Sequence, residues 1–423
     1  NAEFYHGFGS YTIDITAPEQ WLVMSTGELL NGEQVLAEDV YARYTEAGNS
    51  DEVMTIVSPD DFGSATVSSE NGQLTWSFKA EKVRDVAFSA TLESQWDGLR
   101  TPVGDRDGDG ITDYSRIHSF WRQLAPKWEK EAEFAAHAIK FLSEYTEIPY
   151  PWPHMTSVEG SGIIGGGMEF PMMTLMGDYN RAQMQNLYDV TAHELAHMWM
   201  PMIVSSNERR YAWMDEGSTT FHEANARWDY YPDSKSRERE FSAFLWIAGS
   251  DYEGPIMRWS DYHYPGPAYG IASYPKPGSG LIVLQGILGE ELFHEAWTTY
   301  MKDWAYKHPT PYDMFNTFNT VSGQNLDYFW RGYYFETWVM DQAVESVSRD
   351  GNSTTITIRD NGNLILPVLL SIEYADGSSS EAWLKGSRTA SLTLNNAKEV
   401  VKVTIDKEIY FPDVERTNNS WEK

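Results

Sequence analysis

The sequence predicts an α+β protein of several domains, with an antiparallel β domain first, a mainly helical domain in the middle and a β-sandwich at the carboxyl end. The chain has 423 residues, more than one ordinary domain holds. Apolar residues alternate with a period of two in the first and last parts of the chain, whereas spacings of three and four dominate between them. We therefore expect three domains, over residues 1–100, 101–341 and 342–423.

The amino-terminal domain is predicted to be an antiparallel sheet. Alternating runs occur at Tyr11–Thr16 and Leu74–Lys79, and the turn dipeptides Asn31-Gly32 and Asn71-Gly72 separate such runs. Dipeptides of this kind tolerate the positive φ angles that tight hairpins require. Strands joined by short turns are therefore expected up to about Glu93.

The middle domain is predicted to be helical from about Ser115 onward. Its first amphipathic stretch, residues 120–145, places apolar residues at spacings of three and four. Pro201 would close the next helix, because proline lacks the backbone donor that a helix needs. Further helices are expected at residues 187–200, 216–230, 281–302, 311–321 and 326–340.

The carboxyl-terminal domain is predicted to be a β-sandwich. After Ala343 the apolar period returns to two, and glycine and asparagine turns separate the runs. Strands are expected at residues 354–358, 364–374 and 400–405.

The composition excludes several classes of partner. Sixty-two acidic residues against thirty-two basic ones give a formal charge of -30, which repels nucleic acid phosphates and anionic membrane surfaces. No apolar run approaches the ~20 residues that a membrane-spanning helix needs, so membrane insertion is not expected. The chain has no cysteine, so any zinc must be held by histidine and carboxylate groups.

The start of the chain bears on cellular location. The first residue is Asn1 rather than methionine, and strand-like sequence follows directly. We expect that a segment ahead of it was removed or omitted, and a cleaved export signal would fit. A periplasmic or secreted protein is therefore expected, with a cytoplasmic location left open. The sequence gives no oligomeric state.

The segment Val190–Trp199 contains a pattern typical of a metal site. His193 and His197 are four residues apart, so an α-helix places both on one face and both can reach one metal ion. Glu194 follows the first histidine directly. This spacing lets a carboxylate lie beside the water that the metal activates without being a ligand itself. Glu194 is therefore the candidate general base.

A third ligand is expected downstream, because a catalytic zinc has three protein ligands and one open position. Glu216 has eighteen residues between it and His197, and helical periodicity follows it. A lone histidine pair would more often be a packing or surface pair. Here the pair, the intervening glutamate and the spaced third carboxylate all coincide, which favours one zinc ion held by His193, His197 and Glu216.

The pattern of His193, Glu194, His197 and Glu216 resembles the zinc motif of the gluzincin aminopeptidases, a family that includes aminopeptidase N and leukotriene hydrolase. The chain resembles bacterial members of this family. The resemblance implies a thermolysin-like fold for residues 101–341. The segment Gly165–Phe170 is similar to the family's Gly-x-Met-Glu-Asn motif, although Phe170 replaces the asparagine. By this resemblance Glu169 would bind the substrate's free amino group, and Gly166, Gly167 and Met168 would contact the substrate. A glycine-rich turn is the alternative for this stretch.

The segment Ala272–Gly280 resembles the family segment whose tyrosine stabilises the oxyanion of the reaction. Tyr274 would take that role by resemblance alone, since twenty-five tyrosines make any one of them weak evidence. The resemblance covers nearly the whole chain. It also implies two absent parts, namely the first half of the amino-terminal β domain and the carboxyl-terminal helical domain of larger members, so a fragment or a short lineage is expected.

A second metal site is suggested by Asp105, Asp107, Asp109 and Asp113. These residues stand at positions one, three, five and nine of a loop with glycine at six, as in calcium loops of the EF-hand kind. Arg116 stands at position twelve, where a bidentate glutamate would be expected. An aspartate-rich turn is an equal alternative.

Together these features predict a zinc aminopeptidase that acts on peptides. A metallo-endopeptidase or another zinc hydrolase on the same fold is the alternative if Phe170 has weakened the amine site. A catalytically inactive scaffold is a third possibility, but the intact ligands and base argue against it. The side-chain preference and the physiological substrate do not follow from the sequence.

Overall fold

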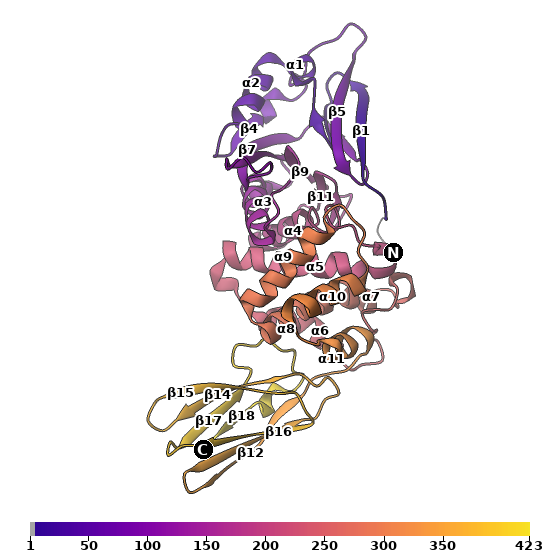
Figure 1. Ribbon diagram of the computed structural model, residues 1–423. Helices are drawn as coiled ribbons and strands as arrows, with labels where there is room; N and C mark the ends of the chain where they lie inside the picture. Colours follow the sequence, from indigo (N-terminus) through magenta and orange to yellow (C-terminus); the bar gives the residue numbers. More distant parts are fainter. Residues whose placement is uncertain (1–4) are drawn as a thin grey trace.

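The computed structural model describes residues 5–423, and the α+β fold class is confirmed. The molecule is elongated, and three parts follow one another along it (Figure 1). Strands of the amino-terminal part lie at the top of the view, helices fill the middle, and the strands of the carboxyl-terminal part lie at the bottom.

The amino-terminal part combines two small sheets with two helices. β1 (Gly9–Pro18) pairs antiparallel with β5 (Gln73–Val83), which also pairs with β3 (Glu28–Leu29). β2 (Leu22–Ser25) pairs with β6 (Phe88–Thr91). Alternate residues of β5 are buried, as the period of two predicted.

This part also contains two helices after β3, which were not predicted. These are α1 (Gly32–Val35) and α2 (Glu38–Ala47). α2 buries Val40, Tyr44 and Ala47, whose spacing of four and three is helical. The helix is short and isolated, so its period was masked by the strands around it.

A six-stranded sheet joins the amino-terminal part to the helices. Its strand order is β10-β11-β9-β8-β7-β4. The strands are β4 (Met54–Val57), β7 (Gln95–Gly104), β8 (Asp113–Trp121), β9 (His154–Glu159), β10 (Gly167–Phe170) and β11 (Met173–Met176). The predicted boundary at residue 100 falls inside β7, so one sheet runs across it. The division into domains stays a prediction.

The expected helix over residues 120–145 begins later than predicted. β8 continues to Trp121, and α3 runs from Glu131 to Thr146. The last five residues of β8 are all buried, and a strand covered on both faces has no alternation that would distinguish it from a buried helix.

Nine helices, counted within residues 131–329, form the middle part. They are α3 (Glu131–Thr146), α4 (Met184–Ala196), α5 (Glu208–Tyr230), α6 (Arg237–Leu245), α7 (Pro267–Ser273), α8 (Pro275–Leu288), α9 (Glu290–Trp304), α10 (Pro311–Ser322) and α11 (Asp327–Phe329). α5 and α8 approach closely at Gly217, where an added Cβ would lie 2.6 Å from Pro277. α6 and α7 were not predicted.

Two of the expected helices have different bounds for clear backbone reasons. The stretch 281–302 is divided at Gly289, whose φ of 81° is outside the helical range and separates α8 from α9. Within the stretch 326–340, helical structure ends at Phe335. It consists of the short helix α11 followed by a π-helical turn, η5 (Trp330–Phe335). The helix expected at 216–230 starts earlier, at Glu208, with a break at Tyr211.

The carboxyl-terminal part consists of two antiparallel sheets around one core. One sheet has the order β12 (Gln342–Asp350), β13 (Ser353–Asp360), β16 (Thr389–Asn395). The other has the order β15 (Ser379–Leu384), β14 (Val368–Tyr374), β17 (Val400–Ile405), β18 (Ser420–Glu422). Buried residues of both sheets, including Ile356, Leu370 and Val403, form a single hydrophobic cluster, as in a β-sandwich.

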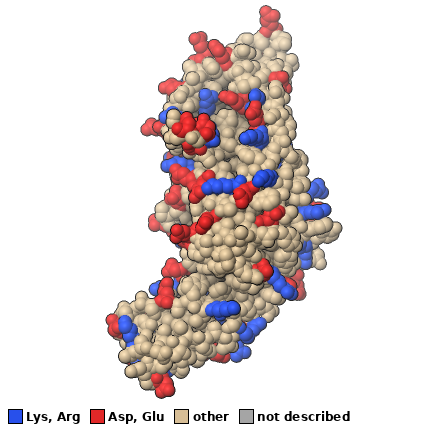
Figure 2. All heavy atoms as spheres, in the orientation of Figure 1, with Lys and Arg blue, Asp and Glu red and all other residues tan. Residues whose placement is uncertain are grey.

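The charged side chains are not segregated on the visible face. Figure 2 shows Lys and Arg scattered among Asp and Glu rather than gathered into one patch. Among residues 5–423, no helix combines the length and the apolar character that crossing a lipid bilayer requires.

Candidate active site

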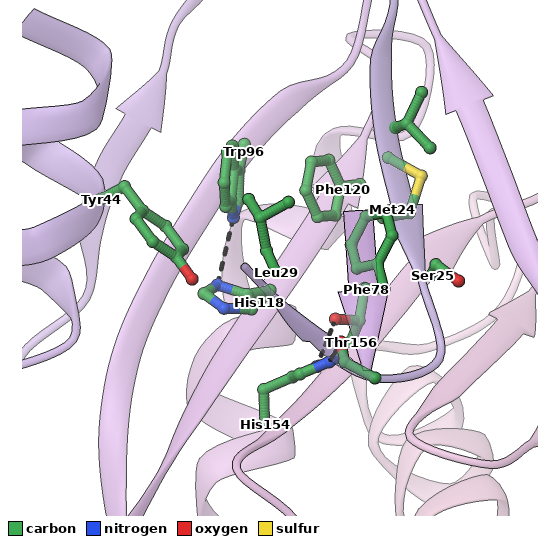
Figure 3. Close-up of a pocket in the computed structure, with 12 residues that line it drawn as sticks. Met24, Ser25, Leu29, Tyr44, Phe78, Trp96, His118, Phe120, His154 and Thr156 are labelled. Atoms are coloured by element: carbon green, nitrogen blue, oxygen red, sulfur yellow. Dashed lines mark hydrogen bonds between the residues drawn. The ribbon is translucent and has the colours of Figure 1, made fainter. Parts of the chain in front are cut away.

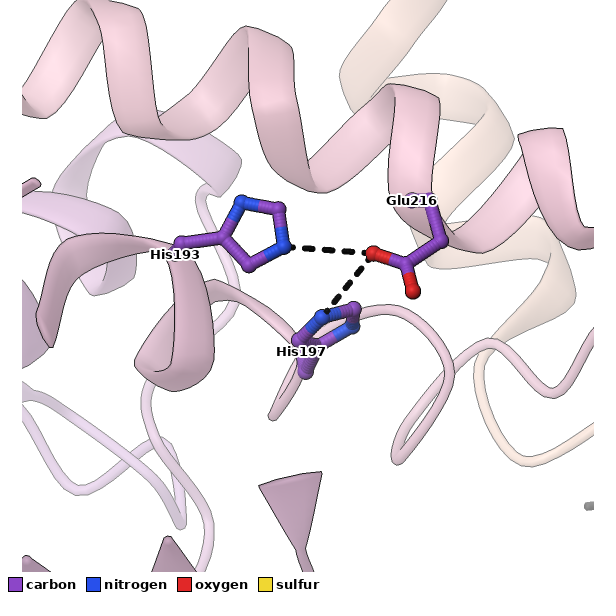
Figure 4. A group of neighbouring side chains, drawn as sticks. All are labelled: His193, His197 and Glu216. Carbon is purple, nitrogen blue, oxygen red and sulfur yellow. Dashed lines mark hydrogen bonds and ion pairs between the residues drawn. The ribbon is translucent and has the colours of Figure 1, made fainter. Parts of the chain in front are cut away.

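The three predicted ligands converge at the contact between α4 and α5. His193 lies in the last turn of α4, His197 follows directly after the helix, and Glu216 lies on α5. Glu216 Oε2 is 3.2 Å from His193 Nε2 and 3.4 Å from His197 Nε2 (Figure 4). One donor atom from each of the three residues lies within 4.8 Å of the others, so one ion could contact all three.

Each histidine is held on its other ring nitrogen. His197 Nδ1 lies 2.7 Å from Asp215 Oδ1 and 3.1 Å from the carbonyl oxygen of Met200. His193 Nδ1 lies 3.2 Å from Glu223 Oε2. These contacts favour the tautomer in which Nδ1 carries the proton and Nε2 is left for a metal.

The supporting carboxylates Asp215 and Glu223 were not predicted from the sequence. The spacing of both residues from Glu216 in the sequence could have indicated them. Asp215 directly precedes Glu216, and Glu223 follows it by seven residues, which is about two helical turns on the same face.

Glu194 is buried beside the ligands, and its Oε2 atom has no hydrogen-bond partner among the described residues. Burial raises the pKa of Glu194 to about 8. The carboxylate packs against β10 at Gly167, where an added Cβ would lie 2.2 Å from Glu194 Oε1. Only glycine leaves room for the side chain of Glu194 at this position.

Glu169 lies on β10 and is buried next to the metal ligands. Carboxylate oxygens of Glu169 and Glu194 and a ring nitrogen of His197 lie within 4.8 Å of one another. Burial raises the pKa of Glu169, and His197 opposes that change. A carboxylate in this place is suited to bind a cationic group of a ligand.

Tyr274 reaches the same site from the junction of α7 and α8. Its hydroxyl donates a hydrogen bond of 2.6 Å to Glu216 Oε1, and its ring stacks on that of His193 with centroids 5.9 Å apart. Burial, aided by the charge of Glu216, raises the pKa of Tyr274 well above its usual value. The phenol therefore stays protonated and can donate.

These residues line a cavity of about 550 Å³, large enough for a short peptide segment. Its wall consists of Gly166, Gly167, Met168, Glu169, Tyr179, Asn186, Asp189, Val190, His193, Glu194, His197, Glu216, Glu223, Arg239 and Tyr274. Every residue predicted for the zinc and substrate site is among them.

A second cavity lies between the amino-terminal strands and the six-stranded sheet (Figure 3). Its volume is only about 40 Å³, about that of a single water molecule. Trp96 Nε1 donates to His118 Nδ1 there, and Thr156 lies 3.1 Å from His154 Nδ1. Polar side chains that line this cavity thus form hydrogen bonds with one another, and the cavity is too small for a substrate.

The donor set at the larger cavity fits zinc. Two imidazole nitrogens and one carboxylate oxygen are the ligands of a common catalytic zinc site, which keeps a fourth position open. The buried Glu194, whose Oε2 has no hydrogen-bond partner among the described residues, lies in the same cavity wall as these donors. The residues present can therefore hold such an ion.

The predicted calcium loop is the connection between β7 and β8. Asp105 accepts hydrogen bonds from the backbone of Gly108 and Gly110, as in an aspartate-rich turn. Oxygens of Asp105, Asp107 and Asp113 lie within 4.8 Å of one another, without Asp109. The turn accounts for these contacts, so calcium binding stays a prediction.

Comparison with known families identifies the middle of the chain. Residues 130–333 match the peptidase family M1 domain. Tricorn protease-interacting factor F2 of Thermoplasma volcanium is 25% identical over 304 residues, which are 68% of this chain and 36% of that protein. Aminopeptidase 2 of Candida albicans is 23% identical over 304 residues, which are 66% of this chain and 32% of that protein.

Among solved structures, the fold is similar to that of Legionella pneumophila aminopeptidase A in complex with aspartic acid. The TM-score is 0.66 and the sequence identity 15%, and the match covers 96% of this chain and 44% of that one. The chain thus spans less than half the length of these relatives. The resemblance inferred from the motifs is confirmed by these matches.

Proposed function

We propose that this chain, whose residues 130–333 match the peptidase family M1 domain, is a zinc-dependent aminopeptidase, which removes amino-terminal residues from peptides. One observation carries the proposal. The donor atoms of His193, His197 and Glu216 converge in one cavity, with the buried Glu194 and Glu169 beside them.

Each residue has a distinct task in this proposal. Zinc, when bound, would polarise the scissile carbonyl and lower the pKa of the attacking water. Glu194 accepts a proton from that water and delivers it to the leaving nitrogen as the peptide bond breaks. Glu169 binds the α-ammonium group of the substrate, which positions the first peptide bond for attack. Gly166, Gly167 and Met168 line the same strand wall.

Tyr274 is assigned to the developing negative charge on the carbonyl oxygen. Its protonated phenol lies in the cavity wall next to Glu216, so it can donate a hydrogen bond to the carbonyl oxygen of the substrate as negative charge develops there. Replacement by phenylalanine should lower kcat with little change in zinc content, since the phenol is not a ligand.

A metallo-endopeptidase is the second candidate function, and Phe170 is the observation that favours it. The family asparagine is absent there, although Phe170 itself does not line the cavity. Glu169 retains a place in the wall, which supports the aminopeptidase. An inactive scaffold is disfavoured, because it would not need a buried base beside three metal-binding groups.

Hydrolysis of paired peptide reporters, one with a free and one with an acetylated amino terminus, tests the proposal. The zinc-loaded protein should cleave the free reporters and leave the acetylated ones, and Glu169→Gln should lose most of that preference. Cleavage of both forms by the wild-type protein at similar rates would favour the endopeptidase. Glu194→Gln serves as the control for a contaminating peptidase.

Two narrower proposals rest on the sequence. We propose export to the periplasm or the medium, which cell fractionation tests. We also propose calcium binding at Asp105, Asp107, Asp109 and Asp113, supported only by their loop spacing. Added calcium should then raise the melting temperature, and an unchanged melting temperature would remove the idea.

A further inference from the structure

The active-site cavity extends beyond the metal ligands along α4. Asp189 and Val190 precede His193 by four and three residues, so they lie about one helical turn, roughly 5 Å, from His193 along the helix axis. Arg239, on α6, closes this end of the cavity. It is the only lysine or arginine among the residues described as lining the cavity.

Each end of the cavity lies next to a different one of the two histidines. Glu169 lies at the His197 side, within 4.8 Å of it, whereas Glu223 contacts His193. With the substrate amine at Glu169 and the carbonyl at the ligands, the rest of the peptide must continue toward Arg239. An extended residue spans ~3.3 Å, so the first or second residue after the cleaved bond reaches this end.

The acidic groups at this end are already paired. Arg227 is buried and lies 3.5 Å from Asp189 Oδ1 and 3.0 Å from Glu223 Oε1. The other oxygen of Glu223 faces His193, and the other oxygen of Asp189 accepts from Arg239 Nη2 at 3.2 Å. Each oxygen of the two carboxylates thus has a cation or an imidazole within 3.5 Å, and of these oxygens only Asp189 Oδ1 makes no hydrogen bond to a described residue.

Arg239 is the charged group of this cluster that faces solvent. Its side chain is 45% exposed, compared with 11% for Asp189 and 22% for Glu223. Its Nη2 atom bonds to Asp189, and within residues 5–423 no other hydrogen bond of the guanidinium is found. Several N–H donors of the planar guanidinium are thus left without a partner among the described residues, in a side chain that lines the cavity, and such a fork matches a carboxylate.

We propose that Arg239 binds a carboxylate carried by the leaving part of the substrate. Two sources have this chemistry: the free α-carboxylate of a dipeptide, and the side chain of an Asp or Glu just after the cleaved bond. The inference rests on the proposed aminopeptidase function and adds a substrate class to it. Arg239 acts as a specificity residue, since it does not touch the reacting atoms.

The test compares matched peptides. Ala-Ala and its carboxyl-terminal amide differ only in the α-carboxylate, and the amides of Ala-Glu and Ala-Gln differ only in the side-chain charge. For the wild-type protein we expect kcat/KM about tenfold higher for the charged member of the pair that fits, in line with a charge-assisted hydrogen bond. Arg239→Gln should bring that ratio close to one.

Control variants separate this effect from a general change of charge. Arg331→Gln removes the same charge at an exposed position outside the cavity, and it should keep the wild-type ratio. Arg239→Lys keeps a charge but loses the planar fork, and it should retain part of the ratio. The same ratio in the wild type and Arg239→Gln would overturn the proposal.

Calorimetry measures peptide binding directly, so it tests the proposal without requiring that the peptide be hydrolysed. In the Glu194→Gln background, the charged member of the pair that fits should bind about tenfold more tightly than its uncharged partner, and adding Arg239→Gln should remove the difference. A protein that hydrolyses no reporter but shows this difference would contradict the proposed function and support the subsite. Hydrolysis without any carboxylate preference would do the reverse.

Discussion

The cavity has two walls that are built in different ways. The helical wall, from α4 and α5, carries the predicted metal ligands, and further hydrogen bonds hold each histidine. The other wall is β10, a four-residue strand at the edge of the six-stranded sheet, where it pairs with β11. It carries Glu169 and the glycine against which Glu194 packs. The spacing of residues along helices positions the groups of the first wall. The close contact between β10 and Glu194 of α4 positions those of the second.

The largest effect is expected at the strand wall, from Gly167→Ala. The new Cβ would overlap the carboxylate of Glu194, which must then move away from its position near the ligands. A displacement of about 1 Å at a general base costs on the order of 100-fold in rate. We expect kcat/KM to fall by about that factor while the zinc content stays at the wild-type value.

Gly165→Ala is the matched control for this prediction. A Cβ at Gly165 would meet no atom within 4 Å, so activity should change little. Equal losses in the two variants would show that the loop tolerates no alanine anywhere, and would remove the special role given to the contact between Gly167 and Glu194.

A smaller effect is expected at the helical wall, where the supports of the two histidines differ. His197 is almost fully buried, and Asp215 holds it at 2.7 Å, whereas His193 is partly exposed and Glu223 lies at 3.2 Å. Asp215→Asn should weaken zinc binding about tenfold, and Glu223→Gln by less. Competition with a chromogenic chelator measures both. A larger loss in Glu223→Gln would contradict this ranking.

The smallest effect on activity is expected at the back of the helical wall, where the predicted change is in stability. Glu131 is fully buried on α3 and accepts a hydrogen bond from Thr191 of α4. Burial raises its pKa from 4.5 to about 8, so in between these values the folded protein keeps a proton that the unfolded chain releases. Its contribution to stability is therefore complete below pH 4.5 and is lost as the pH rises toward 8.

Glu131→Gln should remove this pH dependence. Relative to the variant, the wild-type free energy of unfolding should fall by about 1 kcal/mol per pH unit over that window. Urea unfolding at a series of pH values measures it. Parallel pH profiles for the two proteins would show that Glu131 is ionised in the folded state.

The two walls also show how much the sequence could predict. His193 and His197 follow from helical spacing, which places residues four apart on one face. Glu194 follows from its place directly after His193, and Glu216 from the need for a third ligand and the helical pattern that it opens. Glu169 and Tyr274 came only from family resemblance, since a short edge strand and a helix junction have no period that points at a metal. Their positions depend on how β10 and α7 pack against α4.

Other features of the molecule lay outside the reach of local patterns. Arg239 lies on a helix that was not predicted, and its place in the cavity depends on the packing of α6 against α8. The end of β8 is buried on both faces, so its sequence does not distinguish it from a helix. Gly289 lies inside the predicted helix over residues 281–302, and only its positive φ in the structure separates two helices.

The central claim is that one zinc ion is held by His193, His197 and Glu216, with Glu194 acting on water rather than on the metal. Metal analysis and peptide hydrolysis of the wild type and Glu194→Gln test it together. The account predicts one zinc per chain in both proteins and activity only in the wild type, which is lost on chelation and restored by zinc. Loss of zinc from Glu194→Gln, or full activity of a zinc-free wild type, would contradict it.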